Sequence, residues 1–143
     1  EIDTDNNWSS IPVLFSSDDS WYAKPDAGSM IVSPADVSPC KPHDAWANEE
    51  DIARGIYNFE MMMEPKVTKL TSNWAGLRSF APDQSLVIGP DAESANFFWL
   101  AGQGGYGFQT CLAASQIAED ILFNQTSQVP NSISEKFSPY RFA

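Results

Sequence analysis

Residues 102–107 read Gly-Gln-Gly-Gly-Tyr-Gly and match G-x-G-x-x-G, the pattern that opens dinucleotide-binding folds. The pattern follows an apolar run, residues 96–101, and precedes a segment with helical periodicity, residues 109–123. A dinucleotide-binding unit needs a second strand after that helix, with an acidic residue about 20 positions beyond the glycines. Here the sequence passes Asp120, becomes polar and ends. We therefore expect no such unit around this motif.

The same glycines have two other interpretations. Glycine has no side chain, so four of them in a short loop let the backbone approach another group closely. They also precede a predicted helix, whose free N–H groups and dipole favour negative charge at its first turn. The loop is either a tight strand-to-helix connection or a contact with an anionic ligand. The pattern alone leaves both open.

Arg78 is the second feature that suggests chemistry. Residues 66–80 predict a long strand, or two strands with a kink at Gly76. On such a strand Arg78 shares one face with Trp74 and Phe80. An arginine on that face forms either a structural ion pair or a fork for a ligand carboxylate. The excess of acidic residues in the chain favours the ion pair.

The rest of the chain predicts short strands around two principal helices. Residues 1–10 are expected to be loose, and the proline-rich residues 33–48 to form a surface loop. Asn48 is suited to cap a helix that stops at Pro65 and carries an apolar stripe. The further elements are strands at 11–15, 21–34 (a hairpin), 86–88 (ended by Gly89-Pro90) and 96–101 (buried), and a helix at 109–123 with Leu112, Ala113, Ile117, Ile121 and Leu122 on its buried side. Strands and helices do not alternate regularly, so we predict an α+β fold with a mainly antiparallel mixed sheet.

Charge argues against two classes of partner. The chain holds 19 Asp and Glu against 8 Lys and Arg, a formal net charge of −11. Nucleic-acid binding needs a basic face that replaces phosphate counterions, and anionic membranes likewise attract basic residues. No apolar run approaches the roughly 20 residues of a membrane span. We expect no nucleic-acid partner and no membrane segment.

The cysteines and the single histidine give no metal or catalytic signal. Cys40 and Cys111 leave a disulfide open but form no disulfide framework. A zinc site built from both cysteines and His43 would have the wrong ligand spacing. His43 lies in a proline-rich stretch, where a surface position is expected rather than a place in a catalytic triad. We assign no metal ligand and no catalytic residue.

Three stretches taken together resemble a known family. They are WAGLRSFAPDQSLVIGPDAESANFFWLAGQGGYGFQT, the predicted hairpin WYAKPDAGSMIVSPAD and the ending FSPYRF. They resemble the C-terminal part of FAD-dependent amine and amino-acid oxidoreductases, the D-amino acid oxidase superfamily, nearest its D-arginine dehydrogenase-like branch. The resemblance covers residues 20–142. It implies that the chain is the substrate-domain part of a two-domain enzyme and lacks the N-terminal, Rossmann-type FAD-binding half.

The resemblance also implies roles for single residues. Arg78 would hold the substrate carboxylate with two hydrogen bonds, and Tyr22 would place its hydroxyl near the carboxylate or the amine. The other residues implied in the substrate pocket are Gly76 and Gln109. Those implied beside the flavin of FAD are Gly104, Gly105, Tyr106, Gly107, Gln109 and Thr110. The helix that starts near Gln109 would direct its positive end at the pyrimidine edge of the flavin, where the reduced ring is negative.

The implied reaction is hydride transfer to FAD from the α-carbon of an amine or amino acid, with a D-amino acid favoured. The imino acid would hydrolyse to a keto acid and ammonia. The chain alone is expected to be inactive and to divide into a polar lead-in (1–19), a substrate and flavin-proximal segment (20–123) and a polar tail (124–143). Its implied partners are the substrate, the missing half and, through exposed apolar surface, a second copy. A cytoplasmic location is expected.

Two other functions remain open. The chain could be a stand-alone acidic module that binds carboxylates through Arg78 without catalysis. It could also be a purely structural or interaction domain, in which case Arg78→Lys and Gln109→Ala would change stability and no binding constant.

Overall fold

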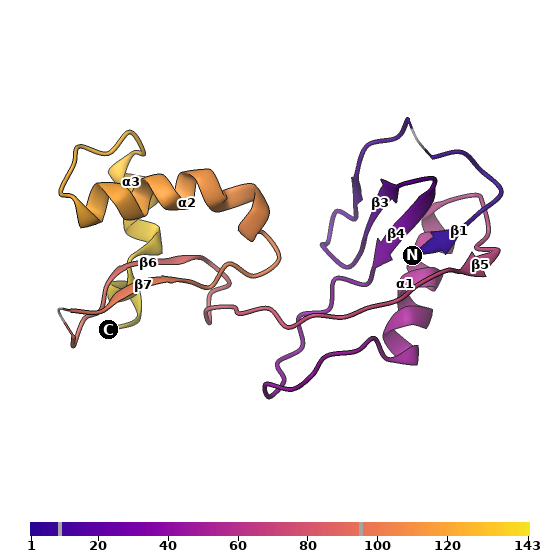
Figure 1. The fold of residues 1–143 in the computed structure, drawn as a ribbon, viewed down its shortest axis with the longest axis horizontal. Coiled ribbons are helices and arrows are strands. Elements are labelled where there is room, and N and C mark those ends of the chain that lie inside the picture. The colour runs from indigo at the N-terminus through magenta and orange to yellow at the C-terminus, as the bar shows by residue number, and fades with distance from the viewer. Residues whose placement is uncertain (9, 95) are drawn as a thin grey trace. The chain divides into compact units, whose positions relative to one another are not determined.

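The computed structural model describes residues 1–8, 10–94 and 96–143, and it divides the chain into two compact units, Glu1–Leu77 and Arg78–Ala143. Each unit has its own sheet and its own principal helix (Figure 1). The first sheet has the strand order β2-β3-β4-β1-β5, and the second consists of β6 and β7. The strand pairs of both sheets are antiparallel. The predicted α+β class with mainly antiparallel strands is confirmed.

The first unit is built on a hairpin of β3 (Tyr22–Asp26) and β4 (Ser29–Ser33), as predicted for residues 21–34. Ala27 and Gly28 form its turn, and both have positive φ. Three two-residue strands complete the sheet: β1 (Ile2–Asp3), β2 (Leu14–Phe15) and β5 (Lys69–Leu70). Strand β1 lies between β4 and β5 because Ile2 pairs with both Met30 and Leu70.

Helix α1 (Glu49–Met62) begins where predicted. The Asn48 side chain accepts a hydrogen bond from the backbone N–H of Asp51 at 2.8 Å, and the first turn holds three acidic residues. Phe59 is fully buried on the inner face, where its ring meets the rings of Trp8 and Trp21 edge to face, at centroid distances of 6.1 and 6.4 Å. The helix ends before Pro65, so both its bounds and its core-facing side follow the sequence pattern.

Two predictions for this unit are wrong. Residues 1–10 are not loose, because Ile2 in β1 is paired on both sides and Trp8 is buried, with its indole Nε1–H donating to Thr4 Oγ1 at 2.6 Å; Ser9 lies outside the described residues. Residues 66–80 form no long strand. Only β5 pairs there, since its partner β1 is two residues long, and the chain then continues without regular structure.

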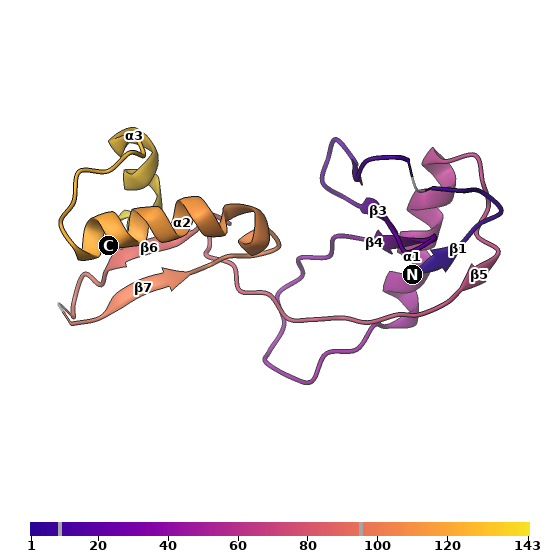
Figure 2. The same ribbon diagram turned by 45° about the horizontal axis from the view of Figure 1, so that its top comes forward.

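In the second unit, a β-hairpin packs against a long helix. Strand β6 (Val87–Pro90) pairs with β7 (Phe98–Ala101), and α2 (Gly107–Leu122) lies across them (Figure 2). Three short turns follow: α3 (Asn131–Ser134), η1 (Glu135–Phe137) and η2 (Pro139–Phe142). The core holds Ile88, Ala114, Ile117 and Ala118, and Val129 and Phe137 pack against it. The segment after α2 therefore helps to build this core.

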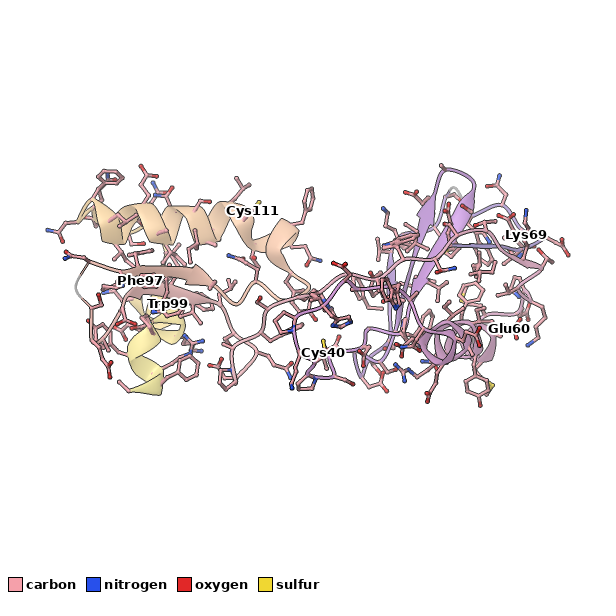
Figure 3. All side chains as sticks on the ribbon, turned by 60° about the horizontal axis from the view of Figure 1, so that its bottom comes forward. Cys40, Glu60, Lys69, Phe97, Trp99 and Cys111 are labelled. Atoms are coloured by element: carbon pink, nitrogen blue, oxygen red, sulfur yellow. The ribbon has the colours of Figure 1, made fainter. Side chains whose placement is uncertain are left out.

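Three predictions for the second unit need correction. Strand β6 does not end at Gly89-Pro90, because both residues pair with β7. Strand β7 is not buried: Trp99 and Leu100 are exposed, and Trp99 stands edge to face with Phe97 at 4.8 Å (Figure 3).

The third correction concerns the buried side of α2. The helix begins at Gly107 and buries Ala114, Ile117, Ala118 and Asp120, whereas Leu112 is 85% exposed. Ala113, Ile121 and Leu122 are exposed as well. Small side chains let the helix lie close to the hairpin, so the larger apolar residues point away from it. Of the five residues predicted for the buried side, only Ile117 is in the core.

The cysteines lie in different units. Cys40 belongs to the loop before α1 and Cys111 to α2; both thiols are free and exposed (Figure 3). His43 is exposed, as predicted. Within the described residues, no three His, Cys, Asp or Glu side chains are grouped so that they could hold a metal ion. None of the helices described is long and apolar enough to cross a lipid bilayer.

Candidate functional site

The glycine loop lies against the segment that opens the second unit. The backbone N–H of Gly104 donates to the carbonyl oxygen of Ser79 at 2.9 Å. Gly104 has φ +53°, and a Cβ placed on it would lie 2.6 Å from Cε1 of Phe80. Glycine is therefore required here for two reasons, the backbone conformation and the close approach of an aromatic ring.

Arg78 reaches the same loop with its guanidinium group. A Cβ placed on Gly105 would lie 3.0 Å from Nη1 of Arg78, so the guanidinium occupies the space that a side chain would fill. Its Cζ is 5.2 Å from the ring centroid of Phe80, within cation–π range. Arg78 lies in an irregular segment and not on a strand beside Trp74, which corrects the predicted strand face. The ring and the loop, rather than a sheet, position this exposed cation.

The start of α2 adds positive electrostatic potential to the loop. Tyr106 is the N-cap residue and makes no side-chain capping hydrogen bond, and the first turn contains no acidic residue. The first helical hydrogen bond runs from the N–H of Thr110 to the carbonyl of Tyr106, at 3.0 Å. The backbone N–H groups of residues 107–109 come before this first helical hydrogen bond, so they have no acceptor within the helix. Such a helix start favours an anionic or electron-rich group nearby.

Gln103 contributes a polar atom that the sequence analysis did not assign. Its side-chain Oε1 is buried and has no hydrogen-bond partner within the described residues. Its side chain packs toward Gly107, where an added Cβ would lie 3.2 Å from Cβ of Gln103. A buried acceptor without a donor costs about 1–3 kcal/mol, so an N–H group supplied by a ligand would be favoured here. The available signal was a polar side chain between two glycines of the motif.

A second arginine in this unit has a structural role. Arg141 donates from Nε and Nη2 to the two carboxylate oxygens of Asp83, at 2.7 and 3.0 Å, and from Nη2 to the carbonyl of Ser85 at 3.1 Å. These hydrogen bonds lower the pKa of Asp83 to about 2. Arg141 thereby ties η2 to the loop before β6. The guanidinium group of Arg141, in the FSPYRF segment, is thus already paired with the carboxylate of Asp83.

The remaining predicted residues are divided between the units. Tyr22 lies half-buried in β3 of the first unit, with its ring centroid 5.8 Å from that of Phe15. Gly76 lies in the irregular end of the same unit, in open surroundings. Gln109 is exposed on the first turn of α2, and Thr110 Oγ1 donates to the carbonyl of Tyr106 at 2.9 Å. The structure therefore brings Arg78 to the glycine loop at the start of α2, and the roles of Tyr22 and Gly76 stay predictions.

Two comparisons with known proteins bear on this arrangement. The sequence profile of the family described as FAD dependent oxidoreductase matches residues 2–121. A crystal structure of L-proline dehydrogenase from P.horikoshii is similar to the chain, with a TM-score of 0.67 and 22% sequence identity. The similarity covers 85% of this chain and 32% of that one. The chain thus spans about a third of the length of a solved protein with which it shares a fold.

Proposed function

The chain belongs to the FAD dependent oxidoreductase family, and on that premise we propose that it forms the substrate-carboxylate and flavin-facing part of an enzyme that oxidises an amine or amino acid. The observation that carries the proposal is the guanidinium of Arg78 beside Gly105, in the loop that opens α2. A cation and a helix N-terminus at one point suit a substrate carboxylate next to an electron-accepting ring.

The residues around the loop fit a flavin ring. Gly104 and Gly105 present backbone without side chains, so a flat ring can approach closely. Gln103 Oε1 accepts no hydrogen bond from the part of the chain that the structure describes, and a flavin carries a ring N–H group that could supply one. The start of α2 holds no acidic residue that would repel negative charge. FAD, when bound, supplies the acceptor for the hydride that leaves the substrate α-carbon.

The proposed tasks of this chain are to hold, to orient and to stabilise charge. Arg78 holds the carboxylate through two parallel N–H donors, and the Phe80 ring keeps the guanidinium in place. Fixing the carboxylate orients the neighbouring α-carbon, which lowers the entropic part of the barrier. The first-turn N–H groups of α2 stabilise developing negative charge without reorganisation, because they are already oriented.

The finer assignment is a D-amino acid substrate and the D-arginine dehydrogenase-like branch. Its support is the resemblance of the stretch from Trp74 to Thr110. The solved structure of similar fold is named for L-proline, so both enantiomers belong in the assay. We also propose that the chain is inactive without an FAD-binding half. Stoichiometric flavin absorbance in the purified 143-residue chain would contradict that part of the proposal.

The decisive experiment compares Arg78→Lys with wild type in the full-length, FAD-loaded protein. Loss of a bidentate charge-assisted contact should raise KM for an amino acid about 10- to 100-fold. The same variant should oxidise the decarboxylated amine as fast as wild type does. Arg54→Lys, a matched change at an exposed arginine of the first unit, should alter neither. An unchanged KM for the amino acid, or an equal loss on both substrates, would exclude Arg78 as the carboxylate ligand.

We further propose self-association of this chain through the outer face of α2. Phe108 is 95% exposed and Leu112 is 85% exposed, four positions apart on that helix. Light scattering tests the proposal. A dimer or larger assembly is expected for the wild-type chain and a smaller species for Leu112→Glu, whereas a monomer at high concentration would refute it.

A further inference from the structure

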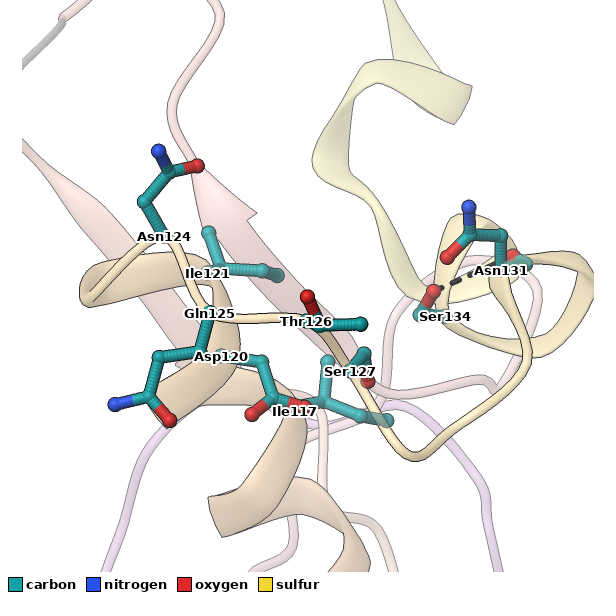
Figure 4. Close-up of a pocket in the computed structure, with 9 residues that line it drawn as sticks. All are labelled: Ile117, Asp120, Ile121, Asn124, Gln125, Thr126, Ser127, Asn131 and Ser134. Carbon is teal, nitrogen blue, oxygen red and sulfur yellow. Dashed lines mark hydrogen bonds between the residues drawn. The ribbon is translucent and has the colours of Figure 1, made fainter.

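The C-terminal end of helix α2 borders a cavity of about 490 Å³ (Figure 4). Its lining consists of Ile117, Asp120, Ile121, Asn124, Gln125, Thr126, Ser127, Asn131 and Ser134. The helix has 16 residues, so its two ends are roughly 24 Å apart at 1.5 Å per residue. The cavity is therefore separate from the site proposed around Arg78.

Asp120 is the feature of this cavity that points to a ligand. Its side chain is buried, with the residue only 5% exposed. Oδ1 accepts a hydrogen bond from the side-chain amide of Gln116 at 2.9 Å, whereas Oδ2 has no partner within the described part of the chain. A buried carboxylate oxygen without a donor is costly, and more so than a neutral acceptor. Asp120 belongs to the wall of the cavity, so a cation bound there would compensate the charge of this carboxylate.

The electrostatics of the cavity select a cation. Asp120 is the one charged residue among the nine that line it. The C-terminal end of α2 adds partial negative charge, and the last turn of that helix contains no basic residue to offset it. Within the described residues no group of three His, Cys, Asp or Glu side chains could hold a metal ion, and Asp120 is the one carboxylate at this cavity. An organic cation with N–H donors fits both the charge and the size.

We propose that this cavity binds the ammonium or guanidinium group of an organic cation, with Asp120 as its counter-ion. The oxygen atoms of the neutral amides and hydroxyls in the 124–127 loop and in α3 accept hydrogen bonds from its remaining N–H groups. Ile117 and Ile121, on the helical wall, contact its alkyl part. A free amine and a Lys side chain both present an ammonium group, so the experiment has an arm for each of these two sources.

The test is an NMR titration of the full chain with n-butylammonium and, separately, with n-butanol. Butylammonium should shift the amide signals of residues 124–127 in a saturable way, and the neutral alcohol should not. Asp120→Asn keeps the shape and removes the charge, and it should weaken binding about tenfold or more. Glu119→Gln makes the same charge change at the exposed neighbouring residue and should bind as wild type does.

A second pair of variants leaves Asp120 intact. Ser134→Leu fills part of the cavity, whereas Ser132→Leu places the same side chain on α3 outside the lining. Only the first should weaken binding, and well-dispersed spectra confirm folding of each variant.

Nα-acetyl-lysine N-methylamide represents a lysine side chain of a protein and is titrated in the same way. Its binding extends the site to lysine side chains, and binding of butylammonium alone restricts it to free amines. Equal binding by Asp120→Asn and wild type, equal shifts with butanol, or no saturation would overturn the proposal.

Discussion

The two units of the chain differ in the size of the apolar side chains that they bury. The first unit buries Ile2, Trp8, Trp21, Met30 and Phe59. The second buries Ile88 and Ile117 with two alanines, while Phe108 and Leu112 stand exposed on α2. Burial of apolar surface is the main stabilising contribution to a fold. The first unit therefore has the larger buried core, whereas the second has a smaller core beside the residues proposed for function.

The largest expected difference in stability comes from substituting alanine for one phenylalanine in each unit. Phe59→Ala removes a fully buried ring that contacts two tryptophans, and it should lower the free energy of unfolding of the first unit by about 3–5 kcal/mol. Phe108→Ala removes a 95% exposed ring and, at a concentration where the chain is monomeric, should change stability by less than about 0.5 kcal/mol. Urea denaturation, followed by the NMR amide signals of each unit, measures both values. Equal effects of the two substitutions would remove the distinction between the units.

The comparison also shows which parts of the fold a sequence can predict. The β3–β4 hairpin and α1 follow from local signals, a turn at Ala27-Gly28 and a cap at Asn48, and both are confirmed. The burial of Ile2 and the irregular chain after Leu70 depend on which distant strands pair, and no local pattern contains that information. The predicted face of α2 is wrong because Leu112 and Leu122 point outward, whereas Ala114 and Ala118 pack against the hairpin.

Some residues of the candidate site can likewise be predicted from the sequence, whereas others cannot. A motif and a resemblance identify Arg78 and the glycines. Nothing in the sequence identifies Gln103 Oε1 or Asp120 Oδ2, because burial without a hydrogen-bond partner is a property of the folded chain. A polar residue in a sequence does not reveal whether its atoms meet water, protein or neither. Such residues can be found only after the surrounding elements have been placed.

A pair of glycine substitutions gives the next largest contrast. Gly28 and Gly104 both have positive φ, and only Gly104 is in close contact with another group, the ring of Phe80. Gly28→Ala should cost about 1–2 kcal/mol, from the backbone conformation alone. Gly104→Ala adds an overlap with the ring and should cost about 2–4 kcal/mol; urea denaturation followed by the NMR amide signals of each unit measures both losses. Equal losses would mean that Phe80 moves aside freely and does not fix the loop.

A smaller effect on stability is expected at low pH, where Asp83 becomes protonated. Hydrogen bonds from Arg141 lower the pKa of Asp83 from 3.8 to about 2. The folded state binds this proton less readily than the unfolded state, so the contribution of the pair is complete above pH 3.8 and is lost as the pH falls through about 2. The second unit should lose thermal stability over that interval, and Asp83→Asn should remove this part of the pH dependence. The same acid dependence in wild type and Asp83→Asn would show that the pair does not stabilise the unit.

The smallest expected effect separates the two helices at their first turns. Helix α1 starts with a side-chain cap and three acids, and α2 starts with neither. Glu50→Gln should therefore lower the stability of the first unit by a few tenths of a kcal/mol, whereas Gln109→Glu should raise that of the second by about 0.3–1 kcal/mol.

The same Gln109→Glu substitution should act against function. It places a negative charge at the N-terminus of α2, where we propose that the helix faces the flavin. A fixed negative charge disfavours the reduced, anionic ring, so the flavin midpoint potential of the full-length, FAD-loaded protein should fall. Spectroelectrochemistry measures that potential, and thermal denaturation of the same sample measures stability. A gain in stability with an unchanged potential would show that the start of α2 is uncapped for a reason other than the flavin. A gain in stability with a lower potential would explain why α2, which carries the site, lacks the acidic residues that stabilise the start of α1.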